Sequence, residues 1–145
     1  MKCLIKITDT HFADGETESS EITLPGSISF YGEDYKIRYR ETDEALKDCF
    51  VTVSFEDGCR VRVTRSGAFN SEMIMEPGKR YICVYSTPAG NINMGIFTQR
   101  LESLMSQSGG LLKFEYSLDV NGGYVSRNIL EIEIKQTTYP IKSLA

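Results

Sequence analysis

Hydrophobic side chains recur at every second position along most of the chain. Cys3, Ile5 and Ile7 alternate with other residues in the first run, and residues 35–41 alternate tyrosine or isoleucine with charged residues. A period of two places successive side chains on opposite faces of a β-strand. The pattern predicts an all-β protein of about nine or ten antiparallel strands joined in sequential hairpins.

The first two runs meet at Asp14 and Gly15, which suit a two-residue type I′ turn because both residue types tolerate positive φ. Such a turn places Ile7 opposite Ile22, so that apolar side chains share one face. The pair Pro25–Gly26 is expected to end the second run.

The apolar faces also select the register of the hairpin around residues 56–58. A three-residue loop pairs Val51 with Val63, whereas a two-residue loop would place the valines opposite arginines and a threonine. The three-residue register sets Cys49 opposite Arg65.

The remaining hairpins follow from the same reasoning. A three-residue loop at residues 121–123 pairs Phe114 with Leu130. Residues 73–76 and 81–87 are expected to form a hairpin around the Pro-Gly turn between them.

Two stretches are less regular. Gly95 interrupts residues 92–98 and predicts a bulge or a close approach of another group. Residues 99–106 suit either an extended or bulged strand or a helix with one apolar face, and we favour the strand.

A sheet of many twisted strands with one apolar face tends to close on itself, because closure buries that face and removes the edges. The sequence therefore predicts a single antiparallel, mostly up-and-down barrel of about 8 to 10 strands. The barrel is expected over residues 1–136, and residues 137–145 form a tail that loses the pattern. A two-sheet sandwich is the alternative.

Charge and targeting signals limit the partners. The chain has 145 residues and a net charge of −4. General nucleic-acid binding needs an excess of Lys and Arg, which is absent here. Residues 1–8 lack the apolar region of a signal peptide, and no apolar run approaches the roughly 20 residues that cross a bilayer. We expect a cytoplasmic protein with no membrane or nucleic-acid partner.

Catalytic and metal-binding motifs are missing. The cysteines Cys3, Cys49, Cys59 and Cys83 form no CxxC motif, and the single histidine, His11, lies near a hairpin tip where we expect it to be solvated. Thiols in the cytoplasm stay reduced, so disulfides are not expected. No Ser–His–acid set and no phosphate-binding glycine motif can be read. We expect no metal, no cofactor and no enzymatic activity.

Four segments carry a family signature. They are Arg65-Ser66-Gly67-Ala68, Tyr85-x-Thr87-Pro88-x-Gly90, Met94-Gly95-Ile96-Phe97-Thr98, and the hairpin from Gly109-Gly110 to Asn121-Gly122. Together they resemble the YwiB family of small bacterial proteins. The resemblance implies a calycin-like (lipocalin-like) barrel and supplies no activity, because the function of that family is unknown.

The candidate site combines one arginine with several tyrosines. Arg65 has the parity of Val61 and Val63, so it points to the apolar face, where a guanidinium must be paired or hydrogen-bonded. It is either an anion clamp or a structural arginine paired with a carboxylate such as Glu41 or with loop carbonyls. The tyrosines either fill the core or line a pocket. The candidate ligand-binding residues are Arg65, Tyr35, Tyr39, Tyr81, Tyr85 and Thr98.

Two functions are consistent with this sequence. The first is a barrel that binds a small, partly apolar or anionic ligand, which requires an open cavity of roughly 300 Å³ or more. The alternative is a non-enzymatic protein-interaction module or structural homodimer, which requires a filled barrel and an exposed apolar patch.

Overall fold

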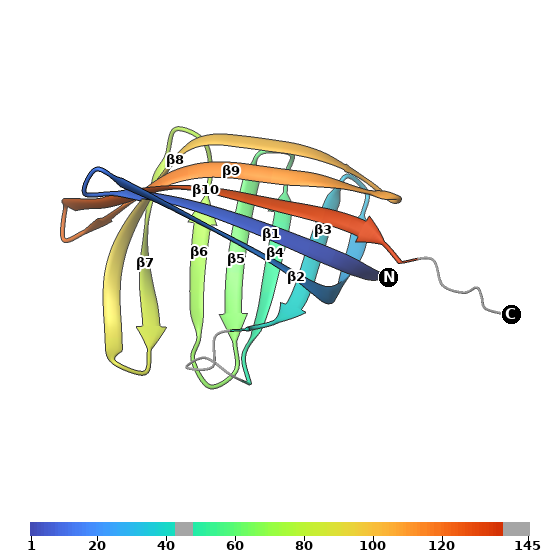
Figure 1. Ribbon diagram of the computed structural model, residues 1–145, viewed down its shortest axis with the longest axis horizontal. Helices are drawn as coiled ribbons and strands as arrows, with labels where there is room; N and C mark the ends of the chain where they lie inside the picture. Colours follow the sequence, from blue (N-terminus) through green and yellow to red (C-terminus); the bar gives the residue numbers. More distant parts are fainter. Residues whose placement is uncertain (43–47, 138–145) are drawn as a thin grey trace, which may run out of the picture.

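The chain forms ten antiparallel β-strands and no helix within residues 1–42 and 48–137, which the computed structural model describes (Figure 1). The strands are β1 (Lys2–Ala13), β2 (Glu16–Tyr31), β3 (Asp34–Arg40), β4 (Phe50–Glu56), β5 (Arg60–Ser66), β6 (Ser71–Met75), β7 (Arg80–Thr87), β8 (Gly90–Ser106), β9 (Gly109–Val120) and β10 (Gly123–Gln136). They make one sheet in the order β6-β5-β4-β3-β2-β1-β10-β9-β8-β7, whose two ends approach each other. The predicted all-β, up-and-down barrel is confirmed. The predicted tail lies outside the described residues from position 138 onward.

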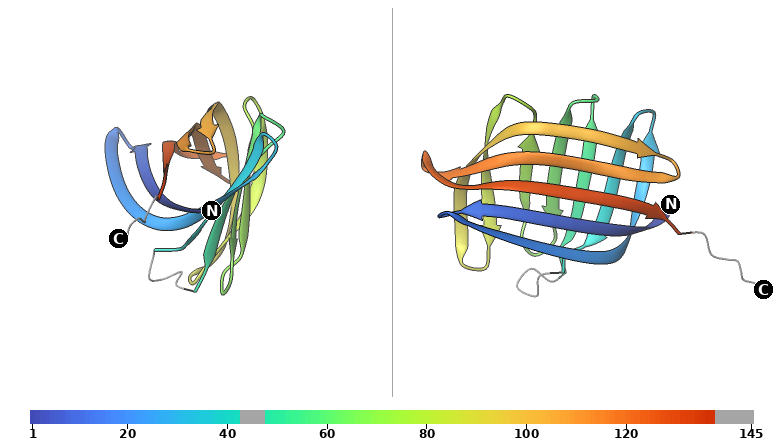
Figure 2. Two further views of the ribbon diagram at one scale, coloured as in Figure 1. Left: turned by 90° about the vertical axis from the view of Figure 1, so that its right-hand side faces the viewer. Right: turned by 45° about the horizontal axis from the view of Figure 1, so that its top comes forward.

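The strands run in two crossing directions. Figure 2 shows β9, β10, β1, the first half of β2 and the second half of β8 along the length of the molecule, with β3 to β7 and the first half of β8 across them. Apolar side chains from both sets meet between them, as shown by the complete burial of Ile5, Ile37, Val61, Ile96 and Phe114. The barrel core therefore forms where the two sets of strands cross.

Strand β2 belongs to both directions. It pairs with β1 through Ser27 and then with β3 from Ser27 to Tyr31. The prediction that Pro25–Gly26 ends this run is wrong, because the strand continues through a bend there. The missing N–H of Pro25 leaves no gap in a ladder with β3, which has not yet begun to pair. A side chain at Gly26 would collide with the Ile5 side chain and the Arg38 carbonyl oxygen.

The β4–β5 register differs from the predicted one by two residues. Glu56 pairs with Arg60, so the loop is residues 57–59 and Val53, not Val51, faces Val63. Asp57 and Gly58 both have positive φ, at 56° and 71°, and Arg60 Nε donates to Glu56 Oε1 at 3.0 Å. These local features place the three-residue loop at residues 57–59, one position later in the sequence than predicted. Every side chain keeps its predicted face, because a shift of two preserves parity.

The shift also changes the neighbours of Arg65. Its partner on β4 is Val51 and not Cys49, which was the predicted one. Cys49 lies fully buried before β4, and its backbone would be struck by any side chain at Gly67.

Two other predicted registers are confirmed. Ile7 pairs with Ile22, and Phe114 pairs with Leu130. The extra residue of the β9–β10 hairpin is not in the loop, however. The turn holds only Asn121 and Gly122, and the register shifts at a bulge between Tyr124 and Ser126 in β10.

The long strand β8 confirms the extended reading of residues 99–106 and has a bulge between Thr98 and Arg100. Gly95 is a close-approach point, because a Cβ there would meet the side chains of Arg80 and Asp119. These two side chains form an ion pair across it, with Arg80 Nε 2.9 Å from Asp119 Oδ2.

The predicted hairpin between residues 73–76 and 81–87 is wrong. Strand β6 pairs with β5 and β7 pairs with β8, so β6 and β7 are the two edges of the sheet. We call the border between them the seam. Near one end of the seam the loop after β6 bonds to β8, where Pro77 bridges Thr98 and the Gly78 N–H donates to the Thr98 carbonyl oxygen at 2.9 Å.

The bend in β2 can be tested by substitution. We expect Gly26→Val to lower the free energy of unfolding by about 2 kcal/mol, because the new side chain must displace Ile5 or the backbone of Arg38. Thr23→Val, on the exposed part of the same strand, should change it by less than about 0.5 kcal/mol. Urea denaturation measures both, and equal midpoints would show that the bend does not need glycine.

Candidate functional site

The six predicted site residues lie in different parts of the barrel. Tyr39 and Arg65 belong to one row across β3 to β6, and Tyr35 belongs to another row of the same strands. The two tyrosines are four residues apart on β3, which is about 13 Å along the strand. Tyr35 and Arg65 are therefore at opposite ends of the crossing strands. Tyr81 and Tyr85 lie on β7, and Thr98 lies on β8.

Tyr35 lines a cavity of about 410 Å³ at the end of the barrel where three turns meet. We call it the mouth cavity. Its lining residues are Phe30, Gly32, Glu33, Tyr35, Phe55, Gly58, Ser103, Met105, Ser106 and Gln107. In Figure 1 the β2–β3 and β4–β5 turns lie above the crossing strands, close to the β8–β9 turn.

Aromatic rings and two hydroxyls shape the mouth cavity. The Tyr35 ring stacks on Phe55 with centroids 5.1 Å apart, and Phe30 lies 6.0 Å away on the other side. The Tyr35 hydroxyl lies 2.6 Å from Ser103 Oγ. Burial raises the pKa of Tyr35, and the hydrogen bond with Ser103 partly offsets this. The tyrosine therefore remains a neutral hydrogen-bonding group at the cavity wall.

Arg65 crosses the seam. Its side chain leaves β5 and is only 4% exposed. Nη2 donates to Ser71 Oγ on β6 at 3.2 Å and to the Ser86 carbonyl on β7 at 3.3 Å. Nη1 donates to the Tyr85 hydroxyl at 3.2 Å, and the guanidinium carbon lies 4.4 Å from the Tyr85 ring centroid. One side chain thus joins β5, β6 and β7.

The hydrogen bonds of Arg65 agree in part with the interpretation of this residue as a structural arginine. Its acceptors are hydroxyls and one backbone carbonyl, and no described carboxylate forms an ion pair with it. Its Nε is buried and has no hydrogen-bond partner among the described residues. A buried guanidinium without a counter-charge is costly. The described residues therefore compensate the positive charge only in part.

Two further tyrosines interact with Tyr85, the ring that Arg65 contacts. Burial raises the pKa of Tyr39, and the nearby Glu41 carboxylate and Tyr85 raise it further. Burial also raises the pKa of Tyr116, with smaller contributions from Asp9 and Tyr85. These phenols stay neutral, so they add no negative charge near the guanidinium.

Tyr81 and Thr98 lie beside the seam. The Tyr81 hydroxyl donates to Glu76 Oε1 at 3.0 Å. Thr98 is completely buried, and its Oγ1 has no hydrogen-bond partner in the part of the chain that the structure describes. Of the six candidates, only Tyr35 and Tyr39 line any of the five described cavities, and they line different ends of the molecule.

Sequence reasoning missed a second polar group inside the barrel. His11 was expected to be solvated, but its Nδ1 lies 2.8 Å from Asn128 Oδ1, and Asn128 Nδ2 donates to the buried Ser126 at 3.0 Å. Asp9 lies on the same face of β1, and its Oδ1 is buried with no hydrogen-bond partner in the described part of the chain. The signal was present in the sequence, because Asp9 and His11 have the parity of Ile5 and Ile7.

Metal ligation has no support in the described residues. They contain no group of three or more His, Cys, Asp or Glu residues that could hold an ion. The four cysteines are free, and three of them are buried. The described part of the chain also has no helix long and apolar enough to cross a membrane.

Comparisons with known proteins agree with this fold. A family model described as "Domain of unknown function (DUF1934)" matches residues 5–132. A crystal structure of the ywiB protein from Bacillus subtilis matches with a TM-score of 0.84 and 20% sequence identity, covering 94% of this chain and 92% of that chain. Curated proteins include no match. The resemblance to the YwiB family is thereby confirmed, and at this identity the structural likeness speaks for the fold alone.

The role of Arg65 at the seam can be measured through a conservative change. We expect Arg65→Lys to lower the free energy of unfolding by about 2 kcal/mol, because an ammonium cannot reach acceptors on both β6 and β7 as the planar guanidinium does. Arg62→Lys, which changes a solvent-facing ion pair on the same strand, should cost less than about 1 kcal/mol. Similar losses in urea denaturation would contradict a special role for Arg65.

The partly buried carboxyl of Asp9 is expected to make the free energy of unfolding depend on pH. Burial raises the pKa of its carboxyl, which the nearby His11 partly offsets; Glu18 and Tyr116 are the other titratable groups near it. A carboxyl whose pKa is higher in the folded state than in the unfolded state stabilises the fold at pH values below its unfolded-state pKa. This stabilisation is lost as the pH rises through the folded-state pKa.

We therefore expect Asp9→Asn to be more resistant to urea than the parent at about pH 7 and to match it at about pH 3, because only the ionised carboxylate is penalised. Asp14→Asn, in an exposed turn, controls for the loss of one negative charge. A gain that is the same at both pH values would argue against a desolvated carboxylate.

Proposed function

Because this chain belongs to the DUF1934 family, whose function is unknown, we propose a function from its geometry: it binds a small, partly apolar molecule in the mouth cavity, without catalysis. The observation that carries this proposal is the cavity itself. Its volume of about 410 Å³ falls within the range of small-molecule sites in proteins.

The lining matches a flat ligand with one or two polar groups. Phe30, Tyr35 and Phe55 offer ring surfaces, and Met105 adds a flexible apolar wall. The paired hydroxyls of Tyr35 and Ser103 provide a donor and an acceptor for orientation. Apolar walls with a few placed polar groups are the usual composition of such sites.

The charge of the lining narrows the ligand class. Glu33 is the charged residue among the lining residues, and no Lys or Arg is present among them. A ligand in this cavity should therefore be neutral or cationic rather than anionic. The mouth cavity therefore favours a partly apolar ligand. An anionic ligand would instead depend on Arg65, which lies in another part of the barrel.

An anionic ligand at Arg65 is the second candidate. The buried, unpartnered Nε favours it, since a carboxylate or phosphate oxygen would complete the hydrogen bonds of the guanidinium. Arg65 lines none of the five described cavities, so such a ligand would have to enter by separating the strands at the seam. The mouth cavity requires no such rearrangement and is the stronger proposal.

The absence of catalysis is also a proposal, and the Tyr35–Ser103 pair supports it. These hydroxyls bond to each other, and no described hydrogen bond joins either of them to a histidine or a carboxylate. A serine or tyrosine hydroxyl needs an adjacent base to act as a nucleophile. The raised pKa of Tyr35 makes its phenolate still less accessible.

Filling the cavity tests the proposal. We expect Ser103→Trp to abolish binding of neutral and cationic aromatic fragments in ligand-observed NMR, because the indole occupies the space between the aromatic rings and the β8–β9 turn. Glu102→Trp, on the opposite and exposed face of β8, should leave fragment binding unchanged.

Native mass spectrometry of the freshly purified protein gives a second readout, since a retained small molecule should be lost in Ser103→Trp and kept in Glu102→Trp. Fragments that bind Ser103→Trp as well as the parent, or a parent that binds none, would reject the mouth cavity. A bound anion that is present in the parent and lost in Arg65→Lys would instead favour the second candidate, an anionic ligand at Arg65.

A further inference from the structure

The first half of β2 is an open strand edge. Glu16 to Thr23 are all exposed, although their side chains alternate between both faces of the strand. These residues pair with β1 on one side, and β3 begins to pair only at Ser27. Figure 2 shows the β1–β2 hairpin curving away from the crossing strands. We call residues Glu16 to Leu24 the β2 edge; its second side offers backbone donors and acceptors to another chain.

The β2 edge is protected by negative charge alone. Charged side chains, especially lysines, together with prolines and bulges commonly prevent an edge from pairing with another strand. Between Glu16 and Leu24 there is no Lys, Arg or Pro, and the pairing with β1 runs without a bulge. Protection begins only at Pro25, where the strand bends. The β2 edge is therefore accessible from Glu16 to Thr23.

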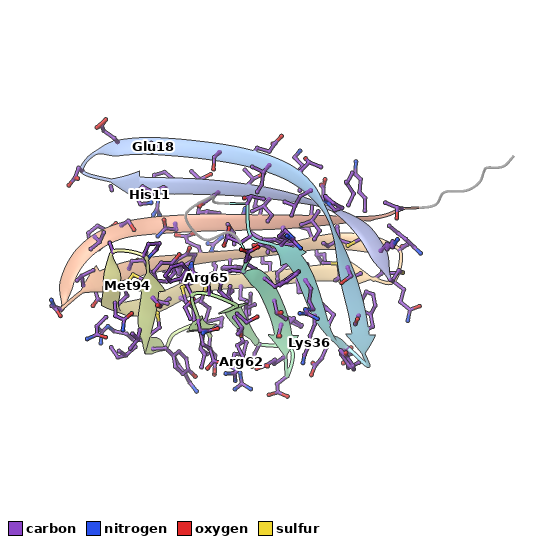
Figure 3. The ribbon with its side chains drawn as sticks, turned by 90° about the horizontal axis from the view of Figure 1, so that it is seen from below. His11, Glu18, Lys36, Arg62, Arg65 and Met94 are labelled. Carbon is purple, nitrogen blue, oxygen red and sulfur yellow. The ribbon has the colours of Figure 1, made fainter. Side chains whose placement is uncertain are left out.

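Its charge is uniformly negative. Glu16, Glu18 and Glu21 lie on this edge, and only Glu21 has a described ion pair, with Lys6 at 3.5 Å. Behind the edge is a cavity of about 340 Å³ lined by Asp9, His11, Glu18, Ser19 and Ser20. Figure 3 places His11 and Glu18 together on this hairpin, apart from Arg65. A cationic side chain would be attracted to this cavity.

Asp9 gives an independent reason for a cationic occupant. Its Oδ1 has no hydrogen-bond partner within residues 1–42 and 48–137, although it is shielded from solvent. Asp9 sits opposite Ser20 on β2 and lines the same cavity as Glu18. A buried carboxylate oxygen without a donor destabilises the fold. A donor from a bound group would satisfy this oxygen.

We propose that the β2 edge binds a basic, extended peptide segment of a partner protein, which adds a strand beside β2 and places a Lys or Arg side chain in the cavity beside Asp9. The alternation of side chains along β2 also specifies the spacing of residues in the peptide. Glu18 and Ile22 face the same side of the strand, and Ile22 is 40% exposed. The segment should carry a basic residue opposite Glu18 and an apolar one opposite Ile22, four positions apart.

A second copy of this chain is a poorer occupant. Pairing two β2 edges would place three glutamates from each copy, Glu16, Glu18 and Glu21, in one two-stranded ladder. Like charges across a strand pair are destabilising. The charge of this edge therefore selects a basic partner. This inference does not depend on the mouth cavity, which is lined by other residues.

The test uses a nine-residue probe peptide with Lys and Val four positions apart and Thr at most other positions. In two-dimensional NMR of the whole protein, its addition should shift amide signals of the β2 edge and of β1. Two further probes carry N-methyl groups on alternate residues, one on each alternate set. An added strand uses only one set of its N–H groups toward the protein, so one methylated probe should lose binding and the other should retain it.

Three variants examine the charges. Glu18→Gln and Asp9→Asn should each weaken binding of the Lys probe by about tenfold, because each removes a charged acceptor for the lysine. Glu33→Gln, at the mouth cavity, should leave the affinity unchanged and shows that net charge alone is not responsible. Asp9→Asn should weaken the peptide while stabilising the fold, an opposite pair of effects that simple unfolding cannot produce.

Other outcomes would overturn the proposal. Equal binding by both methylated probes would mean that the backbone is not used. Equal losses of peptide affinity in Glu18→Gln and Glu33→Gln would mean that the peptide is held by general electrostatic attraction. Spermidine that gives the same shifts at the same concentrations would identify a small-amine site, and a dimer that Glu18→Gln strengthens in sedimentation would identify a self-association edge.

Discussion

Side chains close this barrel, because β6 and β7 share no backbone ladder in the part of the chain that the structure describes. Arg65 is the principal link, since its guanidinium reaches Ser71 on one edge and Tyr85 and Ser86 on the other. The link requires a positive charge in a place that excludes water. The hydroxyl and ring of Tyr85 limit the cost of that charge without cancelling it.

Much of the fold could be predicted because alternation fixes which face each side chain occupies. Alternation cannot distinguish registers that differ by two residues, so the β4–β5 hairpin was displaced while every face was correct. The same ambiguity hid the bulge in β10, which has the effect of a longer loop on all later pairs. Strand breaks are harder still. Pro25 and Gly26 have the composition of a turn, yet they form a bend because β3 has not yet paired there.

The candidate site was less predictable than the fold. Parity placed Tyr35 and Arg65 on the same inner face, but it gives no information on position along the barrel axis. The expected single pocket therefore separates into an aromatic cavity at one end and a charged link at the other. Asp9 and His11 were overlooked because a residue near a hairpin tip is normally solvated, whereas this hairpin is long enough to cover the barrel interior.

The order of strands around the barrel has a consequence for how the chain could be rearranged. Strands β1 and β10 are hydrogen-bonded neighbours without a covalent connection, and Cys3 faces Gln136 across them. Strands β6 and β7 are covalently connected without a ladder. Joining the ends of β10 and β1 and cutting the chain between β6 and β7 would give a circular permutant whose sequence order equals its spatial order. In that permutant the chain would no longer connect the two edges of the sheet, so the natural connectivity acts as a covalent link where backbone hydrogen bonding is sparse.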